Sequence, residues 1–185
     1  MNVQTLVDAV KLKYQTQCPK SNTRPNFQVF FNDLVENDFN TLFKSLPTER
    51  DYFAAAAPGS FHSQIFPEAS LHLAYTSHSL HWLSKLPAEL GYETSPAWNK
   101  GRVHYTSAPE EVVRAYKSRF DEEMRMFLDA RAKELVVGGM LVIIMSGAPI
   151  DLPFSSTANG MMFEFMASSL MEMVQEVINY NIIYN

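Results

Sequence analysis

Short apolar runs alternate with segments of helical periodicity along this chain of 185 residues. The runs at residues 26–32 (NFQVFFN) and 140–145 (MLVIIM) are rich in β-branched or aromatic side chains, so each predicts a buried strand, the first at residues 28–32. Residues 70–75 (SLHLAY) alternate between apolar and polar side chains, which predicts another strand. Strands that alternate with helices are typical of a parallel sheet covered by helices, so we expect an α/β fold of two or three layers.

Four segments, residues 1–16, 38–46, 109–136 and 155–180, are predicted to be helices. The first three carry their apolar residues on one helical face, and the fourth is rich in Met and Phe. In the third, Gly138-Gly139 predicts the end of the helix, and Asp121–Arg125 and Asp129–Lys133 fit ion pairs between successive turns. Residues 52–57 fit a strand or a helix, residues 77–84 a short helix or a turn, and residues 91–101 a loop.

Charge and cysteine content argue against several classes of protein. The net charge is −5 and the charged residues, 19% of the chain, form no basic stripe, so we expect no nucleic-acid partner. Cys18 is the only cysteine, which excludes a disulfide framework within one chain and fits a reducing compartment. The first residues do not resemble a signal peptide, and the longest apolar run is too short to cross a bilayer. We therefore expect a cytoplasmic protein with no membrane partner.

Polar residues follow the predicted strands, where ligands of parallel sheets bind. Asp33 comes directly after the first strand, and its carboxylate fits either the hydroxyls of a ribose or the cap of a local turn. The turn at residues 58–62 (PGSFH) offers backbone N–H groups and an aromatic face. His81 and Trp82 fit either the wall of a substrate pocket or packing beneath a loop.

Motifs of other enzyme classes are absent from the sequence. It has no GxGxxG or GxxxxGK[ST] phosphate loop, which disfavours a nicotinamide oxidoreductase, and no GxSxG of a serine hydrolase. His78 and His81 are three residues apart, but no third zinc ligand follows at a diagnostic spacing. The site is therefore not expected to be a zinc centre.

Several long segments resemble the plant SABATH methyltransferases. They are QVFFNDLVENDFNTLFKSLP, PGSFHSQIFP and SLHLAYTSHSLHWLSKLP, followed by NKGRVHYTS, ARAKELVVGGMLVI and FSSTANGMMFEFMASSLMEMV. The resemblance implies a Rossmann-like fold and an S-adenosylmethionine (SAM)-dependent carboxyl O-methyltransferase, which converts a small plant acid to its methyl ester. Members of the family act on salicylate, jasmonate, indoleacetate or gibberellins, or on xanthine nitrogens.

The resemblance also implies roles for particular residues, and none of them is a general acid or base. The expected cofactor contacts are Asp33, Leu34, Ser60 and Phe61. The expected substrate contacts are His78, His81 and Trp82, although many members have Tyr or Phe where this chain has His78. Asn99 matches a position assigned in some members to a magnesium ion.

Family members are longer than this chain, so the resemblance implies a sheet that is incomplete at both ends. Residues 1–150 are then a partial SAM-binding core, and residues 151–185 begin an α-helical substrate cap with a divergent tail, VINYNIIYN. The family's acidic, glycine-containing cofactor loop would precede residue 1. We expect such a chain to be inactive alone, or to act as a non-catalytic partner in a homodimer or in a heterodimer with a full-length relative.

Overall fold

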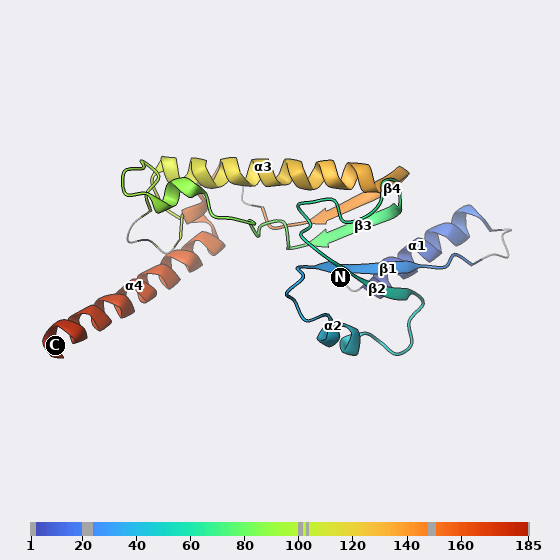
Figure 1. Cartoon of the computed structure of the whole chain (residues 1–185), viewed down its shortest axis with the longest axis horizontal. Helices are drawn as coiled ribbons and strands as arrows, with labels where there is room; N and C mark the ends of the chain where they lie inside the picture. The colour runs from blue at the N-terminus through green and yellow to red at the C-terminus, as the bar shows by residue number, and fades with distance from the viewer. Residues whose placement is uncertain (1–2, 20–23, 100–101, 103, 148–150, 185) are drawn as a thin grey trace. The chain divides into compact units, whose positions relative to one another are not determined.

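The computed structural model describes residues 3–19, 24–99, 102, 104–147 and 151–184. The chain divides into two compact units, Met1–Pro67 and Glu68–Asn185. Within the described residues the strands pair two by two, β1 with β2 in the first unit and β3 with β4 in the second. Both pairs are parallel, as the alternation of strands and helices predicts (Figure 1).

The first unit contains α1 (Val3–Gln17), β1 (Gln28–Asp33), α2 (Phe39–Ser45) and β2 (Phe53–Pro58). The side chain of Asp38 caps α2 by accepting hydrogen bonds from the backbone N–H groups of Asn40 and Thr41. The segment at residues 52–57, which its sequence left open, is a strand. Its small alanines pair with β1 in a register that joins Gln28 to Phe53 and Asp33 to Pro58.

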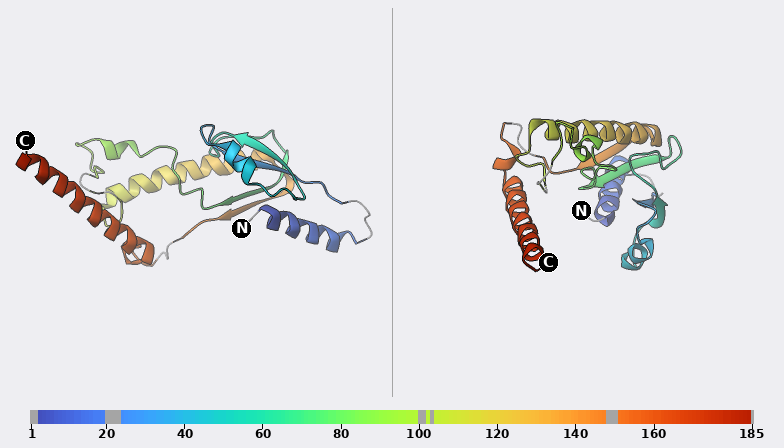
Figure 2. Two further views of the ribbon diagram at one scale, coloured as in Figure 1. Left: turned by 90° about the horizontal axis from the view of Figure 1, so that it is seen from below. Right: turned by 60° about the vertical axis from the view of Figure 1, so that its left-hand side comes forward.

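The second unit contains β3 (Leu71–Ser77), η1 (Ala88–Gly91), α3 (Glu110–Glu134), β4 (Leu135–Ile144), η2 (Phe154–Ser156) and α4 (Ala158–Tyr184). The helix α3 runs alongside the β3–β4 pair (Figure 2). Its buried residues are Val112, Glu123, Phe127, Ala130, Arg131 and Glu134. Residues 78–84 form turns without a helix, and residues 92–99 of the loop predicted at 91–101 follow the short helix η1; residues 100 and 101 lie outside the described part of the chain.

The prediction that Gly138-Gly139 ends the long helix is wrong. The helix α3 ends at Glu134, and both glycines lie inside β4. They form an irregularity in the pairing, because Leu71 pairs with Leu135 whereas Leu73 pairs with Met140. Gly138 has a φ of +80°, and a Cβ on Gly139 would lie 2.9 Å from the carbonyl oxygen of Val136. The glycines therefore serve a tight bulge rather than a helix terminus.

The expectation of fully buried strands is also wrong. In β1 the side chains alternate, so Phe30 is 44% exposed while Val29 and Phe31 are partly buried. In β4 both Ile143 and Ile144 are among the exposed apolar residues. The physical reason is that a pair of strands has no central strand, so among the described residues each strand keeps an open edge and a partly open face.

The ion pairs of α3 differ from those predicted from charge spacing. The structure pairs Arg114 with Glu110, and Arg119 with both Glu122 and Glu123. Near the end of the helix the guanidinium of Arg131 binds the buried carboxylate of Glu134. Spacing of four residues allows a pair to form, but it does not decide which pairs do form. None of the described helices is long and apolar enough to cross a membrane.

Candidate functional site

The four predicted cofactor contacts lie together at the carboxyl end of the β1–β2 pair. Asp33 is the last residue of β1 and pairs with Pro58, the last residue of β2. The backbone N–H of Gly59 donates to the carbonyl oxygen of Asp33 at 2.8 Å, which fixes the turn containing Ser60 and Phe61 beside the strand end. The structure thus brings Asp33, Leu34, Ser60 and Phe61 to one edge of the first unit.

Asp33 holds a local turn with only one of its carboxylate oxygens. Its Oδ1 accepts hydrogen bonds from the backbone N–H of Leu34 at 2.8 Å and from Nδ2 of Asn37 at 2.5 Å. Among the described residues, its Oδ2 has no hydrogen-bond donor. The two interpretations of Asp33 are therefore compatible, because an ionised carboxylate has about four acceptor positions and the turn uses two.

Neighbouring groups add polar and aromatic contacts to this edge. Asn32 donates through Nδ2 to the carbonyl oxygens of Ala57 at 2.7 Å and Gly59 at 2.8 Å, which ties the two strand ends together. The hydroxyl oxygen of Ser60 accepts from the backbone N–H of His62 at 3.3 Å. The half-buried ring of Phe61 lies 4.3 Å from that of His62. The edge combines a carboxylate, a hydroxyl and an aromatic face, the groups that a nucleoside contacts.

The predicted substrate residues follow the carboxyl end of β3 in the second unit. His78 has a φ of +52°, and its backbone N–H donates to the carbonyl oxygen of Ile144 at 2.8 Å. This bond connects the ends of β3 and β4 and turns the chain away from the sheet. His81 and Trp82 then lie on exposed turns, their rings 5.3 Å apart, and Trp82 is 69% exposed. The alternative of Trp82 packing beneath a loop is therefore wrong in this structure.

Asn99 has one property of a ligand. Its Oδ1 is buried and has no hydrogen-bond partner among the described residues. Within the same residues no group of three His, Cys, Asp or Glu side chains is placed to hold a metal ion. Because magnesium takes about six oxygen ligands, Asn99 by itself fits only one position of such a site.

Sequence patterns did not reveal a buried carboxylate that binds the segment after β3. Glu123, on α3, is 2% exposed and accepts hydrogen bonds from the backbone N–H of Ser84 at 3.1 and 3.0 Å and from its hydroxyl at 2.6 Å. The two residues are 39 positions apart. A charged residue within an amphipathic helix suggests a solvated face, so no local signal marks this contact.

A second feature missed by the sequence is an aromatic cluster around His104. Its ring stacks on Phe163 of α4 with centroids 4.2 Å apart, and it also contacts Tyr105. Burial lowers the pKa of His104 below its ordinary value, and the nearby charge of Glu164 partly offsets this shift. Burial also raises the pKa of Tyr116, which packs on Tyr105. Phe154 of η2 also packs against His104 and Tyr105, so the cluster connects η2, α4 and the loop before α3.

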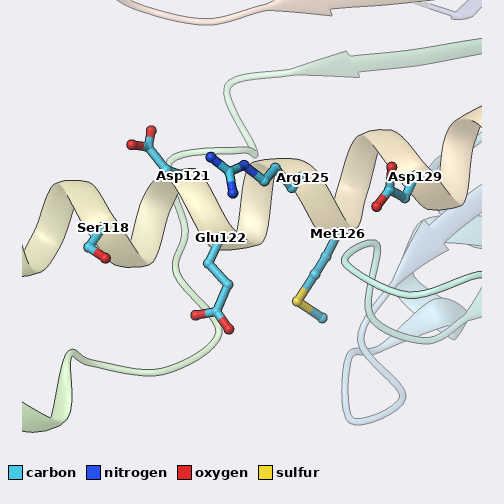
Figure 3. A pocket seen from close by; sticks show the side chains of 6 residues that line it. All are labelled: Ser118, Asp121, Glu122, Arg125, Met126 and Asp129. Atoms are coloured by element: carbon cyan, nitrogen blue, oxygen red, sulfur yellow. The ribbon is translucent and has the colours of Figure 1, made fainter.

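A hollow of about 500 Å³ lies along α3. Its lining consists of Ser118, Asp121, Glu122, Arg125, Met126 and Asp129, all on this one helix (Figure 3). Walls from a single helix do not enclose a ligand, whereas small-molecule sites are concave. We therefore assign the candidate site to the strand ends and not to this hollow.

Comparisons with known proteins connect these residues to one family. The family model described as SAM dependent carboxyl methyltransferase matches residues 1–181. Loganic acid O-methyltransferase from Catharanthus roseus is 46% identical over 177 residues, which are 95% of this chain and 47% of the relative. Farnesoic acid carboxyl-O-methyltransferase from Arabidopsis thaliana is 45% identical over 175 residues, which are 94% of this chain and 49% of the relative.

A solved structure described as "Loganic acid methyltransferase with SAH" has the same fold. It superposes with a TM-score of 0.88 at 46% identity, covering 95% of this chain and 49% of that one. The chain thus spans about half the length of these relatives. The matches confirm the resemblance to SABATH enzymes and the α/β methyltransferase fold expected from the sequence. Since the family model covers nearly the whole chain, this protein belongs to the SAM-dependent carboxyl methyltransferases.

Proposed function

We propose that the chain carries part of the site of a methyltransferase that uses SAM to convert a small plant acid to its methyl ester. The observation that carries this proposal is the edge at Asp33, where a carboxylate oxygen without a donor among the described residues lies beside the turn of Ser60 and Phe61. The names of the relatives support the substrate class, because they specify loganic, farnesoic and gibberellic acids.

In the proposed reaction an oxygen of the substrate carboxylate forms a bond to the methyl carbon of SAM. The bond between that carbon and the sulfonium sulfur breaks, its electron pair stays on sulfur, and the products are the methyl ester and SAH. Carboxylic acids titrate near ~4, so the nucleophile is ionised at neutral pH and no general base is needed. The work of the protein is to hold oxygen, carbon and sulfur in line and to exclude water.

We assign the cofactor to the first unit. Oδ2 of Asp33 accepts hydrogen bonds from the ribose hydroxyls, while Oδ1 stays with Leu34 and Asn37. The hydroxyl of Ser60 and the ring of Phe61 contact the adenosine. In this proposal residues 1–150 form the cofactor-binding core and residues 151–185 begin a substrate cap; the residues just before that boundary, 148–150, lie outside the described part of the chain.

We assign the substrate to the exposed segment after β3. The indole N–H of Trp82 is a donor without acceptor capacity, so it suits a carboxylate oxygen better than a neutral ether or amine. His81 lies next to it and contributes a second ring nitrogen. His78 stands at the start of the same segment and restricts which acids enter. For the magnesium ion we propose Asn99 as a single oxygen ligand, through its buried Oδ1, and no step of the reaction depends on it.

Calorimetric titration with SAH tests the cofactor assignment. We expect the 185-residue chain to bind SAH, and Asp33→Asn to weaken binding at least tenfold, since hydrogen bonds to a charged group contribute about 1.5–3 kcal/mol. Glu36→Gln removes the same charge from an exposed position in the same loop and serves as the control. Equal affinities of the wild type and Asp33→Asn would exclude the role of Asp33, and no binding by any variant would refute a cofactor site in this chain.

A second candidate function is association, either with another copy or with a longer relative. It is favoured by the helix α4, whose exposed apolar side chains include Phe165, Met166 and Val174, and by the open edges of the described strands. Light scattering after size exclusion, with and without a full-length relative, tests it. A strictly monomeric chain that forms no mixed species argues against it.

We place the protein in the cytoplasm, where the exposed thiol of Cys18 stays reduced.

A further inference from the structure

The backbone of the segment that carries His81 and Trp82 is held by contacts at both of its ends, although both side chains are exposed. At its beginning the backbone N–H of His78 donates to Ile144 of β4 at 2.8 Å. In its middle Leu80 is buried, with 4% of its surface exposed. At its end Ser84 is bound by Glu123 of α3. The backbone is therefore held in place while the two rings project from it.

The connection to Glu123 includes a buried, charged carboxylate. The carboxylate receives the backbone N–H and the hydroxyl of Ser84, and Arg119 donates both to this carboxylate at 2.6 Å and to the Ser84 hydroxyl at 2.9 Å. A carboxylate that is 2% exposed is stable only when such partners replace water. Since Ser84 is two residues from Trp82, a buried charge on α3 holds the backbone close to the residue that carries the indole.

We propose that Glu123 is a positioning residue for substrate recognition, acting through Ser84 on Trp82. An exposed indole on an unrestrained turn samples many orientations, and a ligand that binds it must first order it. The network of Glu123, Ser84 and Arg119 restricts the turn before the ligand arrives, which raises affinity without any contact between Glu123 and the acid. This inference rests on the proposed role of Trp82 in binding a carboxylate.

Mobility of Trp82 tests the network in the absence of ligand. In a Trp98→Phe background Trp82 is the only tryptophan, and its time-resolved fluorescence anisotropy reports local motion. We expect Glu123→Gln, which keeps the volume of the side chain, to increase the amplitude of the fast anisotropy decay. Ser84→Ala, at an exposed position, is expected to act in the same direction and covers the case in which Glu123→Gln does not fold. Unchanged decays in the folded variants would overturn the proposal.

The matched control is Glu122→Gln. Glu122 also binds Arg119, at 2.8 Å, but its side chain is exposed, so this variant should leave the anisotropy decay of Trp82 unchanged. If Glu122→Gln increases the motion of Trp82 as much as Glu123→Gln does, the effect comes from the charge of the helix in general, and the specific role of Glu123 is refuted. Helix content from circular dichroism is compared for every variant.

Measuring the affinity for a substrate acid then tests whether the motion of Trp82 affects recognition. With SAH present, the affinity for loganate is expected to fall by up to about tenfold in Glu123→Gln, because the ligand must then order the mobile Trp82 side chain when it binds, while the affinity for SAH stays unchanged. A loose Trp82 with undiminished loganate affinity would overturn the recognition role. Failure of every variant, including the wild type, to bind SAH would refute the proposed function instead, and the anisotropy would still decide whether Glu123 restrains Trp82.

Discussion

Removing one partner of the buried ion pair near the end of α3 should cost the second unit much of its stability. Arg131 is 5% exposed and Glu134 is 0% exposed. Nε and Nη2 of the arginine donate to the two carboxylate oxygens at 2.7 and 2.9 Å, and the guanidinium lies 5.2 Å from the ring of Phe127. Arg131→Met therefore leaves a carboxylate in a site where water cannot replace the lost donors.

The magnitude follows from this geometry. Removing one partner of a buried pair costs about 3–5 kcal/mol, against a total stability of about 5–15 kcal/mol for an ordinary domain. With a urea dependence of about 2 kcal/mol per M, the midpoint of unfolding should fall by about 2 M. Urea titration followed by circular dichroism measures it.

The controls separate the loss of the ion pair from the loss of packing. Arg114→Met breaks the exposed pair with Glu110 and should hardly move the midpoint. Arg131→Met combined with Glu134→Leu removes both charges and should recover much of the loss, since apolar residues of similar volume often replace buried pairs without cost. A midpoint for Arg131→Met within experimental error of the wild type would refute the reasoning, as would a double variant less stable than the single one.

Two further predictions concern β4 and the aromatic cluster. Gly139→Ala should lower the unfolding free energy by about 1–3 kcal/mol, because the new Cβ would lie 2.9 Å from a backbone oxygen. The control is Gly91→Ala, which should not lower it, because there is open space around Gly91. Thermal unfolding compares the two variants, and equal losses of stability would contradict this explanation. His104 should titrate below 6.5 in an NMR pH series. Because its folded pKa is lowered, its contribution to stability is present above the unfolded pKa and decreases as pH falls toward the folded pKa, and His104→Phe should remove this dependence.

Local patterns in the sequence predicted most of the elements correctly. The helix predicted at residues 1–16 is α1, and the strand predicted at residues 28–32 is β1. Both follow from the period of the apolar residues, which is set by the geometry of a helix or a strand and needs no knowledge of distant contacts. The long motifs, from QVFFND onward, also carried the family resemblance that the comparisons confirm.

The tertiary structure decided the features that depend on distant partners. Residues 52–57 became a strand because β1 lies beside them, and the glycines at 138 and 139 became a bulge because β4 pairs with β3. Glu123 looked like one more charge on an amphipathic helix, yet it binds Ser84, 39 residues away. The period of the apolar residues indicates which face of a segment is apolar. It does not indicate whether a charged side chain will be buried, because the cost of that burial is offset only by hydrogen-bond donors that the fold brings from distant segments.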